Sequence, residues 1–407
     1  MRGVFSVVAS CALASAAPHW SALSTDQPSP AYSFEEYVKE FQKTYSQKEY
    51  EEREAIFNQN LEQIRVHNAD PASSWKMGIN QFTDMREDEN FFGLDTGMSK
   101  LNHKGSRPVR SGFPMLGASI EGGKRDISDL PESVDWRTRG IISPVKDQGH
   151  CGSCWAFAAV ANLESYFAKA SGELHTMSVQ QILDCTPNPE ECGGTGGCQG
   201  ATCPLAYDTV IRMGGIASEW TYPYISHPGE NFKCKFNDGL NQTGTTNGTL
   251  AAVGSINGWS QVESNSYEEM MYHIAHKGPL TVSVDASRWK FYTSGVFSGC
   301  PSGDDKVDIN HAVQLVGYGT DPLQGPYWLI RNSWTPKWGE GGYMRLERHT
   351  GKQWCGIDDT PDHGSACKGD DKPIKVCGAC GVLYETHFVT VGKPDKAPVN
   401  PDNLMIQ

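Results

Sequence analysis

The chain reads Gln-Gly-His-Cys-Gly-Ser-Cys-Trp-Ala-Phe over residues 148–157. This stretch puts Cys154 after a glycine-rich turn and directly before a run that predicts a long helix, about Cys154 to Ala170, closed by Ser171 and Gly172. The positive end of a helix dipole favours a thiolate over a thiol. Cys154 is therefore a candidate nucleophile.

A thiol that attacks an amide needs a partner that takes its proton and later delivers one to the leaving amine. His311 stands at the start of an apolar run that predicts a strand, and Asn332 stands at the end of another. We expect His311 to be the acid/base partner and Asn332 to orient its ring. A Cys-x-x-Cys pair such as Cys151 and Cys154 also occurs in redox proteins, but no thioredoxin-like βαβ pattern surrounds this one.

Composition limits the class of partner. The 407 residues carry a formal net charge of -13, and no block of Lys and Arg stands out. Because phosphate binding needs a basic face, we expect no nucleic-acid partner. The partners should be proteins, peptides or small molecules.

The N-terminus has the pattern of a signal peptide over residues 1–16. A charged start is followed by about ten apolar residues and by the small residues Ala14, Ser15 and Ala16. An apolar run of this length is short of the ~20 residues that span a bilayer, so no membrane span is expected. We expect entry into the secretory pathway, with the lysosome, vacuole or cell exterior as destination. Asn241 and Asn247 begin N-glycosylation motifs in a polar stretch that looks like a surface loop.

Periodicity and composition divide the rest of the chain. Aromatic and aliphatic residues spaced by three or four predict a pair of amphipathic helices over about 33–68. Residues 95–129 lose this periodicity and are rich in Gly, Ser and Pro, as a linker would be. Runs such as 280–284, 311–318 and 327–332 then predict strands, which indicates an α+β fold. The predicted units are a signal (1–16), an N-terminal segment (17–129, helical over about 33–92), a main domain (130–391) and a disordered tail (392–407).

From about residue 34 to residue 389 the chain resembles the papain family of cysteine peptidases. The resemblance implies that Gln148 helps to hold the oxyanion and that Trp334 shields the hydrogen bond between His311 and Asn332. It implies two subdomains across a cleft, a helical one with Cys154 and a β-barrel-like one with His311 and Asn332. It also implies a cysteine endopeptidase that acts through an acyl-enzyme. The alternative is a catalytically silent binding protein of the same fold, but every catalytic position is intact.

The N-terminal segment resembles the inhibitory propeptides of cathepsin L-like enzymes. Two motifs carry this resemblance: Glu49, Arg53, Phe57, Asn60, Ile64 and Asn68, and then Gly78, Asn80, Phe82 and Asp84. The resemblance implies a zymogen whose propeptide blocks the cleft. We expect release in acid, since protonation of carboxylates such as Asp84 removes paired charge. We place the mature N-terminus near Leu130, after a cut between residues 122 and 130.

Thirteen cysteines, one of them in the signal, are read first as disulfides because the secretory route is oxidising. The resemblance implies three pairs: Cys151 with Cys198, Cys185 with Cys234, and Cys300 with Cys380. Cys192, Cys203, Cys355, Cys367 and Cys377 are extra, and their odd number leaves one free or unexpectedly paired. The last cysteines resemble a zinc site by composition, but we expect disulfides there, no metal and no cofactor.

The resemblance also implies substrate-binding residues. They are Gly200, Ala201, Trp334 and Glu385, of which Ala201 departs from the usual glycine. Glu385 should lie at the floor of the pocket for the side chain two residues before the scissile bond, where its carboxylate could pair with arginine. The short interval from Cys185 to Cys198 leaves no room for an occluding loop, so we expect endopeptidase action. The expected partners are substrates, the chain's own propeptide and cystatin-type inhibitors, with the enzyme as a monomer.

Overall fold

The computed structural model describes residues 32–86, 89, 118–121, 123, 125–236, 251–301, 306–351 and 353–391. The predicted signal, Asn241, Asn247 and the tail from residue 392 lie outside these ranges. Within them, none of the helices combines the length and the apolar character that crossing a membrane requires.

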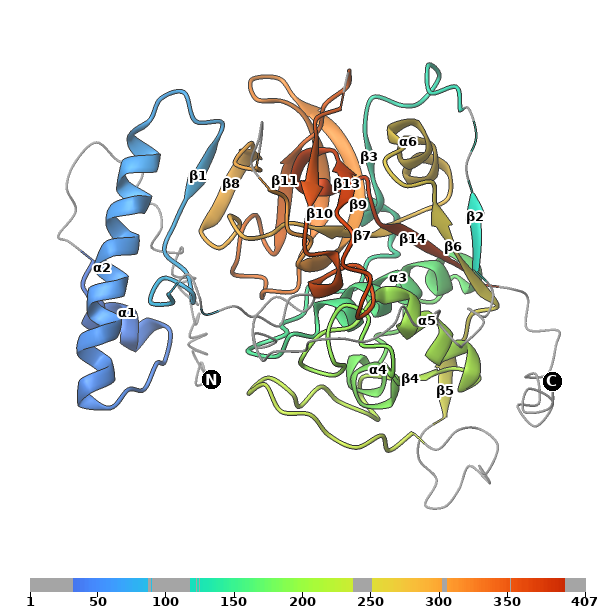
Figure 1. The fold of residues 1–407 in the computed structure, drawn as a ribbon, viewed down its shortest axis with the longest axis horizontal. Coiled ribbons are helices and arrows are strands. Elements are labelled where there is room, and N and C mark those ends of the chain that lie inside the picture. The colour runs from blue at the N-terminus through green and yellow to red at the C-terminus, as the bar shows by residue number, and fades with distance from the viewer. Residues whose placement is uncertain are drawn as a thin grey trace, which may run out of the picture.

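The N-terminal lobe is a helical hairpin followed by a short strand (blue in Figure 1). Ser33 caps the first helix and forms a reciprocal capping box with Glu36, while Ser46 caps the second. The helices pack through an aromatic cluster that includes Phe34, Tyr37 and Phe57. The predicted pair of helices is thus confirmed; the elements are α1 (Phe34–Glu40), α2 (Gln47–Ala69) and β1 (Trp75–Met77).

The helical subdomain of the main domain is built around a buried helix, α3. Its first twelve residues, 154–165, are all buried, and it packs against α4, α5 and strand β9. Gly172 ends the helix with a left-handed φ of 82°, as the Ser171-Gly172 pair predicts. The elements of this part are α3 (Cys154–Ser171), α4 (Val179–Cys185), α5 (Cys203–Arg212), β4 (Ile216–Ala217) and β5 (Ala252–Gly254).

The β-rich subdomain holds a 10-stranded sheet in the order β1-β8-β11-β10-β9-β7-β14-β6-β2, with β3 added beside β9. This order does not close into a barrel. The elements are β2 (Ala118–Glu121), β3 (Val134–Asp135), η2 (Trp136–Arg139), β6 (Gly258–Val262), α6 (Tyr267–His276), β7 (Leu280–Val284), β8 (Tyr292–Phe297), β9 (His311–Asp321), β10 (Gly325–Arg331), β11 (Tyr343–Glu347) and β14 (Thr386–Thr390). A separate hairpin and two short turns follow β11: β12 (Cys355–Asp358), η3 (Pro361–His363), β13 (Ile374–Cys377) and η4 (Ala379–Gly381).

The α+β prediction is confirmed, and the strand predictions are close. β7 matches 280–284, β9 runs three residues beyond the predicted 318, and β10 ends at Arg331, so that Asn332 directly follows it. Sequence analysis missed β2, which lies in the stretch read as a linker and pairs in parallel with β6. The Gly, Ser and Pro content of this stretch does not predict a strand. The strand forms because β6, which is far away in the sequence, pairs with it.

The two sheet ends receive strands from the N-terminal segment. β1 pairs antiparallel with β8, and β2 pairs with β6 on the opposite side of the molecule (Figure 1). Trp75 of β1 packs its ring 4.5 Å from the ring of Phe297. The N-terminal segment is therefore joined to the main domain through main-chain pairing as well as side-chain packing.

Candidate active site

Cys154 is the first residue of α3 and is fully buried. The hydroxyl of Ser153, which precedes it, makes no cap bond and instead lies 2.8 Å from the hydroxyl of Tyr224. The helix dipole therefore acts directly at the thiol. The Cys154 Sγ accepts a hydrogen bond of 3.3 Å from the N–H of Ala312 on β9, which joins the two subdomains at the thiol.

The imidazole and amide that the sequence proposes lie together. His311 Nε2 is 2.8 Å from Asn332 Oδ1, and that oxygen also accepts from the N–H of Ser333 at 2.8 Å. Because the amide oxygen faces Nε2, Nε2 carries the proton, and Nδ1 is the nitrogen that can accept one. The Trp334 ring stacks on His311 at 4.8 Å between centroids.

Burial lowers the pKa of His311 to about 4, although the bond to Asn332 acts in the opposite direction. The ring is therefore neutral at neutral pH in this form of the protein. A neutral imidazole is the form that can take a proton from a thiol, and a thiolate nearby would then stabilise the imidazolium.

Gln148 is buried and hydrogen-bonded through both its side chain and its main chain. Its Nε2 donates to the carbonyl of Cys151 at 3.0 Å, its Oε1 accepts from the Ser333 hydroxyl at 2.7 Å, and its own carbonyl accepts from Tyr224 at 2.9 Å. These bonds place the amide of Gln148 in the turn that leads to Cys154.

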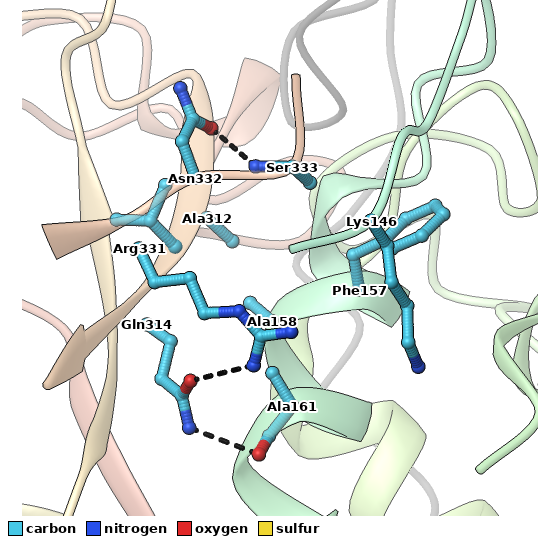
Figure 2. Close-up of a pocket in the computed structure, with 10 residues that line it drawn as sticks. Lys146, Phe157, Ala158, Ala161, Ala312, Gln314, Arg331, Asn332 and Ser333 are labelled. Atoms are coloured by element: carbon cyan, nitrogen blue, oxygen red, sulfur yellow. Dashed lines mark hydrogen bonds between the residues drawn. The ribbon is translucent and has the colours of Figure 1, made fainter. Parts of the chain in front are cut away.

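A buried network fixes the helix that carries the thiol against β9, which begins at His311, and β10, which ends directly before Asn332 (Figure 2). Arg331 donates to Gln314 Oε1 at 3.2 Å, and Gln314 Nε2 donates to the carbonyl of Ala161 on α3 at 3.0 Å. Burial lowers the pKa of Arg331. Sequence analysis did not single out Arg331 or Gln314. The position of Arg331 directly before Asn332 was a signal that could have identified it.

Of the residues proposed to bind substrate, Trp334 contacts His311 directly, and Gly200 and Ala201 follow a segment bonded to the turn before Cys154. Gly152 N–H donates to the carbonyl of Cys198 at 3.0 Å, which aligns the 198–201 segment with the turn before Cys154. Gly200 has a φ of 89°, and Ala201 is fully buried. The fold thus accommodates an alanine at position 201, where the resemblance implies a glycine.

Glu385 lies just before β14 and is 8% exposed. Among the described residues, its Oε2 has no hydrogen-bond partner. Burial raises the pKa of this carboxyl to about 7, opposed by a bond from Ser283. Burial also raises the pKa of the Cys203 thiol, with the Glu385 charge as the next cause, so both groups face the same region.

Five disulfides occur in the described part of the chain. Cys151–Cys198, Cys185–Cys234 and Cys300–Cys380 are the pairs that the resemblance implies. The extra cysteines form Cys192–Cys367 and Cys355–Cys377, and Cys203 is the one left over. The odd count in the sequence signalled a leftover thiol but did not identify it.

The N-terminal lobe reaches Trp334, the residue that stacks on His311. Phe82 packs edge-on against Trp334 at 5.6 Å, and Gln81 Nε2 donates to the Trp334 carbonyl at 3.1 Å. Asn80 Nδ2 donates to the carbonyl of Lys290 at 2.7 Å, and a side chain at Gly78 would meet Thr293. Gly78, Asn80 and Phe82 belong to the second propeptide motif and Gln81 lies between two of its members, so this segment contributes to the contact face.

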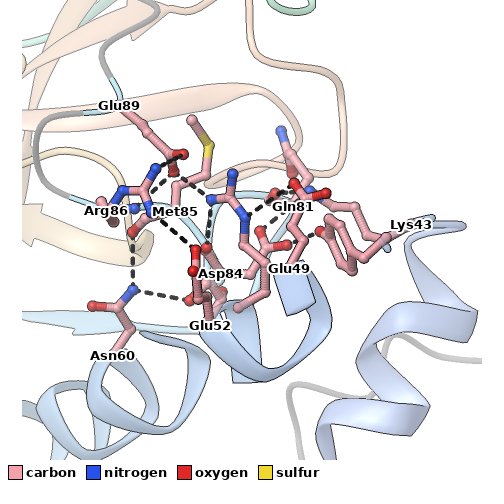
Figure 3. A network of polar contacts seen from close by, with 12 residues as sticks. Lys43, Glu49, Glu52, Asn60, Gln81, Asp84, Met85, Arg86 and Glu89 are labelled. Carbon is pink, nitrogen blue, oxygen red and sulfur yellow. Dashed lines mark hydrogen bonds and ion pairs between the residues drawn. The ribbon is translucent and has the colours of Figure 1, made fainter. Parts of the chain in front are cut away.

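Asp84, the last residue of the second motif, is held by the helical hairpin of the lobe, including residues of the first motif (Figure 3). Asp84, 1% exposed, accepts from the hydroxyl of Tyr37 at 2.8 Å, from Lys43 at 3.2 Å and from the Tyr45 hydroxyl. Arg53 donates to the carbonyl of Asp84 at 3.0 Å. The other members also lie on α2: Glu49 pairs with Arg53, Asn60 bonds the carbonyls of Thr83 and Met85, Asn68 bonds Met77, and Phe57 and Ile64 are buried.

A thiol at a helix N-terminus, opposite a buried imidazole and beside a docked lobe of the same chain, defines a class of protein: a cysteine peptidase in its precursor form. Comparison with known families agrees with this class. "Papain family cysteine protease" matches residues 130–364, and "Cathepsin propeptide inhibitor domain (I29)" matches residues 34–90. The chain belongs to the papain family.

Relatives with assigned names resemble the chain over most of its length. It is 35% identical to fruit bromelain of Ananas comosus over 347 residues, which are 84% of this chain and 88% of that protein. It is 38% identical to ananain of the same plant over 344 residues, 83% and 89% of the two chains. The solved structure of a recombinant stem bromelain precursor covers 88% of this chain and 98% of its own, with a TM-score of 0.66 and 32% identity.

Proposed function

We propose that this protein hydrolyses peptide bonds through Cys154, His311 and Asn332 by way of an acyl-enzyme thioester. It is made as an inactive precursor and activated by removal of its propeptide in acid. One observation carries the proposal: the 2.8 Å contact of His311 with Asn332, next to an Ala312 N–H that donates to the Cys154 sulfur.

The chemistry follows from these positions. His311 Nδ1 takes the thiol proton, and the Cys154 thiolate attacks the peptide carbonyl carbon. The Gln148 side chain and the Cys154 N–H hold the resulting oxyanion, and a donor of this kind contributes about 2.7–4 kcal/mol. The carbon–nitrogen bond then breaks as His311 protonates the leaving amine. Water, deprotonated by the same ring, hydrolyses the thioester and restores the thiol.

The competing function is a papain-fold protein that binds peptides without cleaving them. The test is acid-activated protein with a dipeptidyl coumarin amide and an irreversible thiol-directed epoxide. We expect release of coumarin and its complete loss at one equivalent of epoxide, since the raised pKa of Cys203 makes that thiol a poor nucleophile. Peptide binding without any coumarin release would favour the silent alternative.

Substrate choice is proposed to depend on Glu385. The pocket should accept hydrophobic side chains two residues before the scissile bond, and arginine once the Glu385 carboxylate is ionised. Because the pKa of Glu385 is raised to about 7, the preference for arginine should grow as pH rises through about 7.

The measurement compares two substrates that differ only by Phe or Arg at this position, from pH 5 to 8. In Glu385→Ala the ratio of Arg to Phe cleavage should fall about tenfold at pH 8 and lose its pH dependence. Glu385→Gln keeps the shape and hydrogen bonding but removes the charge, so it should also lose the pH dependence. Unchanged ratios in both variants would show that Glu385 does not face the substrate.

The domain boundary and cellular setting are part of the same proposal. Pro131, the proposed second mature residue, is anchored by the Tyr318 hydroxyl, which donates to its carbonyl at 2.8 Å. A cut before Leu130 would therefore leave this anchor in the mature enzyme. We place the protein in the secretory pathway, in a lysosome, vacuole or outside the cell, as a monomer regulated by its own propeptide and by cystatin-type inhibitors.

A further inference from the structure

Residues 355–377 form a covalently fixed crossing between the two subdomains, which we call the strap. Its base is the β12–β13 hairpin, in which Cys355 lies opposite Cys377 and is bonded to it. Its far part carries Cys367, which is bonded to Cys192 in the loop after α4. The strap therefore starts in the β-rich subdomain and ends on the helical one.

On the helical side, the strap is held by main-chain bonds as well as by the disulfide. Gly193 N–H donates to the Ala366 carbonyl at 2.9 Å, and Lys368 N–H donates to the Glu190 carbonyl at 3.1 Å. The Lys368 ammonium also pairs with Glu191 at 2.9 Å. These contacts fix the strap to the loop after α4 at several points.

On the β side, the strap packs against the segment that leads into His311. Val307 N–H donates to the Ile357 carbonyl at 3.2 Å, and Ile309 N–H donates to Asp358 Oδ2 at 3.4 Å. Lys306 pairs with Asp359. Ile309 is two residues before His311, so the strap lies close to the catalytic histidine.

The strap packs closely against both subdomains. Gly364 is buried, and a Cβ there would lie 1.7 Å from the Ile309 carbonyl oxygen. A Cβ on Gly193 would lie 2.8 Å from the Gly364 carbonyl oxygen and 3.0 Å from the carbonyl carbon of Ala201. Main chain from three segments is thus in close contact from Ala201 across to Ile309.

We propose that the strap closes the acyl side of the cleft after two residues, so that the enzyme releases dipeptides from free N-termini. This inference rests on the proposed function, in which Ala201 and Glu385 bind the residue two before the scissile bond. A third residue would have to pass where Gly193 and Gly364 meet. The interval from Cys185 to Cys198 is too short for an occluding loop of its own, but Cys192 within it anchors a crossing segment from elsewhere in the chain.

The test uses two coumarin substrates that share their last two residues, one a dipeptide with a free amine and one an N-acetylated tetrapeptide. For the activated wild-type enzyme, kcat/KM should be about 100-fold higher for the dipeptide. Replacing the tether by Cys192→Ser with Cys367→Ser should raise kcat/KM for the tetrapeptide about tenfold and leave the dipeptide nearly unchanged.

Two further variants keep the test decisive. Cys355→Ser with Cys377→Ser removes the bond at the base but keeps the tether, so the preference for the dipeptide should persist. If the tether variant does not fold, replacing residues 356–376 by Asn-Gly joins two positions that are already paired and should release the same restriction.

Equal cleavage of both substrates by the wild-type enzyme would overturn the inference and leave the proposed peptidase intact. A preference for the dipeptide that survives both loss of the tether and removal of the strap would also overturn it. Cleavage of neither substrate would overturn the peptidase proposal itself, and the inference with it.

Discussion

Cys154→Ala should reduce peptide hydrolysis by at least about 10⁴-fold, because His311 and Asn332 then have no nucleophile to activate. The methyl group of alanine fits the fully buried site without a new polar group, so the fold should be retained. The measurement is the rate of coumarin release from a dipeptidyl substrate, together with the mass of protein labelled by a thiol-directed epoxide.

The control for Cys154→Ala is Cys203→Ala, which removes the other free cysteine of the described chain. Epoxide labelling should disappear in Cys154→Ala and persist in Cys203→Ala. Labelling that persists in Cys154→Ala, or activity within about tenfold of wild type, would contradict the assignment of the nucleophile.

Asp84→Asn should destabilise the N-terminal lobe by about 3–5 kcal/mol, since it removes the charge at the centre of a buried polar network. Asp84 accepts from Tyr37, Tyr45 and Lys43, and an amide cannot satisfy the same donors or balance the Lys43 charge. The expected result is early loss of hydrogen-exchange protection in α1 and α2, measured in the full-length precursor with Cys154→Ala to prevent self-digestion.

The matched control for Asp84→Asn is Glu49→Gln on the same lobe. Glu49 is 45% exposed and its pair with Arg53 spans 3.8 Å, so its loss should cost under about 1 kcal/mol. If both variants protect the helices as well as wild type does, Asp84 does not stabilise the lobe. In the active background, Asp84→Asn should also allow activation at a pH where wild type stays inactive.

Protonation of Glu89 should destabilise the N-terminal lobe in acid. Burial acts to raise the pKa of Glu89, but bonds from Arg53 and from the Arg86 N–H outweigh it and leave the pKa lowered. A group whose pKa is lowered on folding stabilises the folded state above its ordinary range, and this stabilisation is lost as pH falls through the folded pKa. The lobe should therefore loosen at a pH below the ordinary range of a glutamate, about 4.3, which fits the proposed activation in acid.

The sequence predicted those parts of the site that local rules determine. A glycine-rich turn before a helix located Cys154, and strand ends located His311 and Asn332, because each signal lies within a few residues of its position. The helices of the N-terminal lobe followed from spacing and caps in the same way. The cleft-spanning strap could not be predicted, since five extra cysteines leave five choices of free thiol and three pairings of the rest.

Interactions between distant segments were also beyond sequence reasoning. Arg331 and Gln314 connect β9 and β10 to α3 through buried bonds whose donors and acceptors are far apart along the chain. The strand β2 depends on the free side of β6 and not on its own composition. Both features depend on the tertiary structure that the local elements build.

Removal of the propeptide would also take two strands out of the large sheet, although the catalytic chemistry does not need this loss. Both terminal strands, β1 and β2, precede Leu130, so a cut there takes a partner from each end of the sheet. Of the 10 strands, the eight that remain expose unpaired N–H and C=O groups on β8 and β6. Open strands of this kind are templates for intermolecular pairing. The precursor is therefore the form that is better protected against aggregation, because the propeptide strands cover both edges of the sheet.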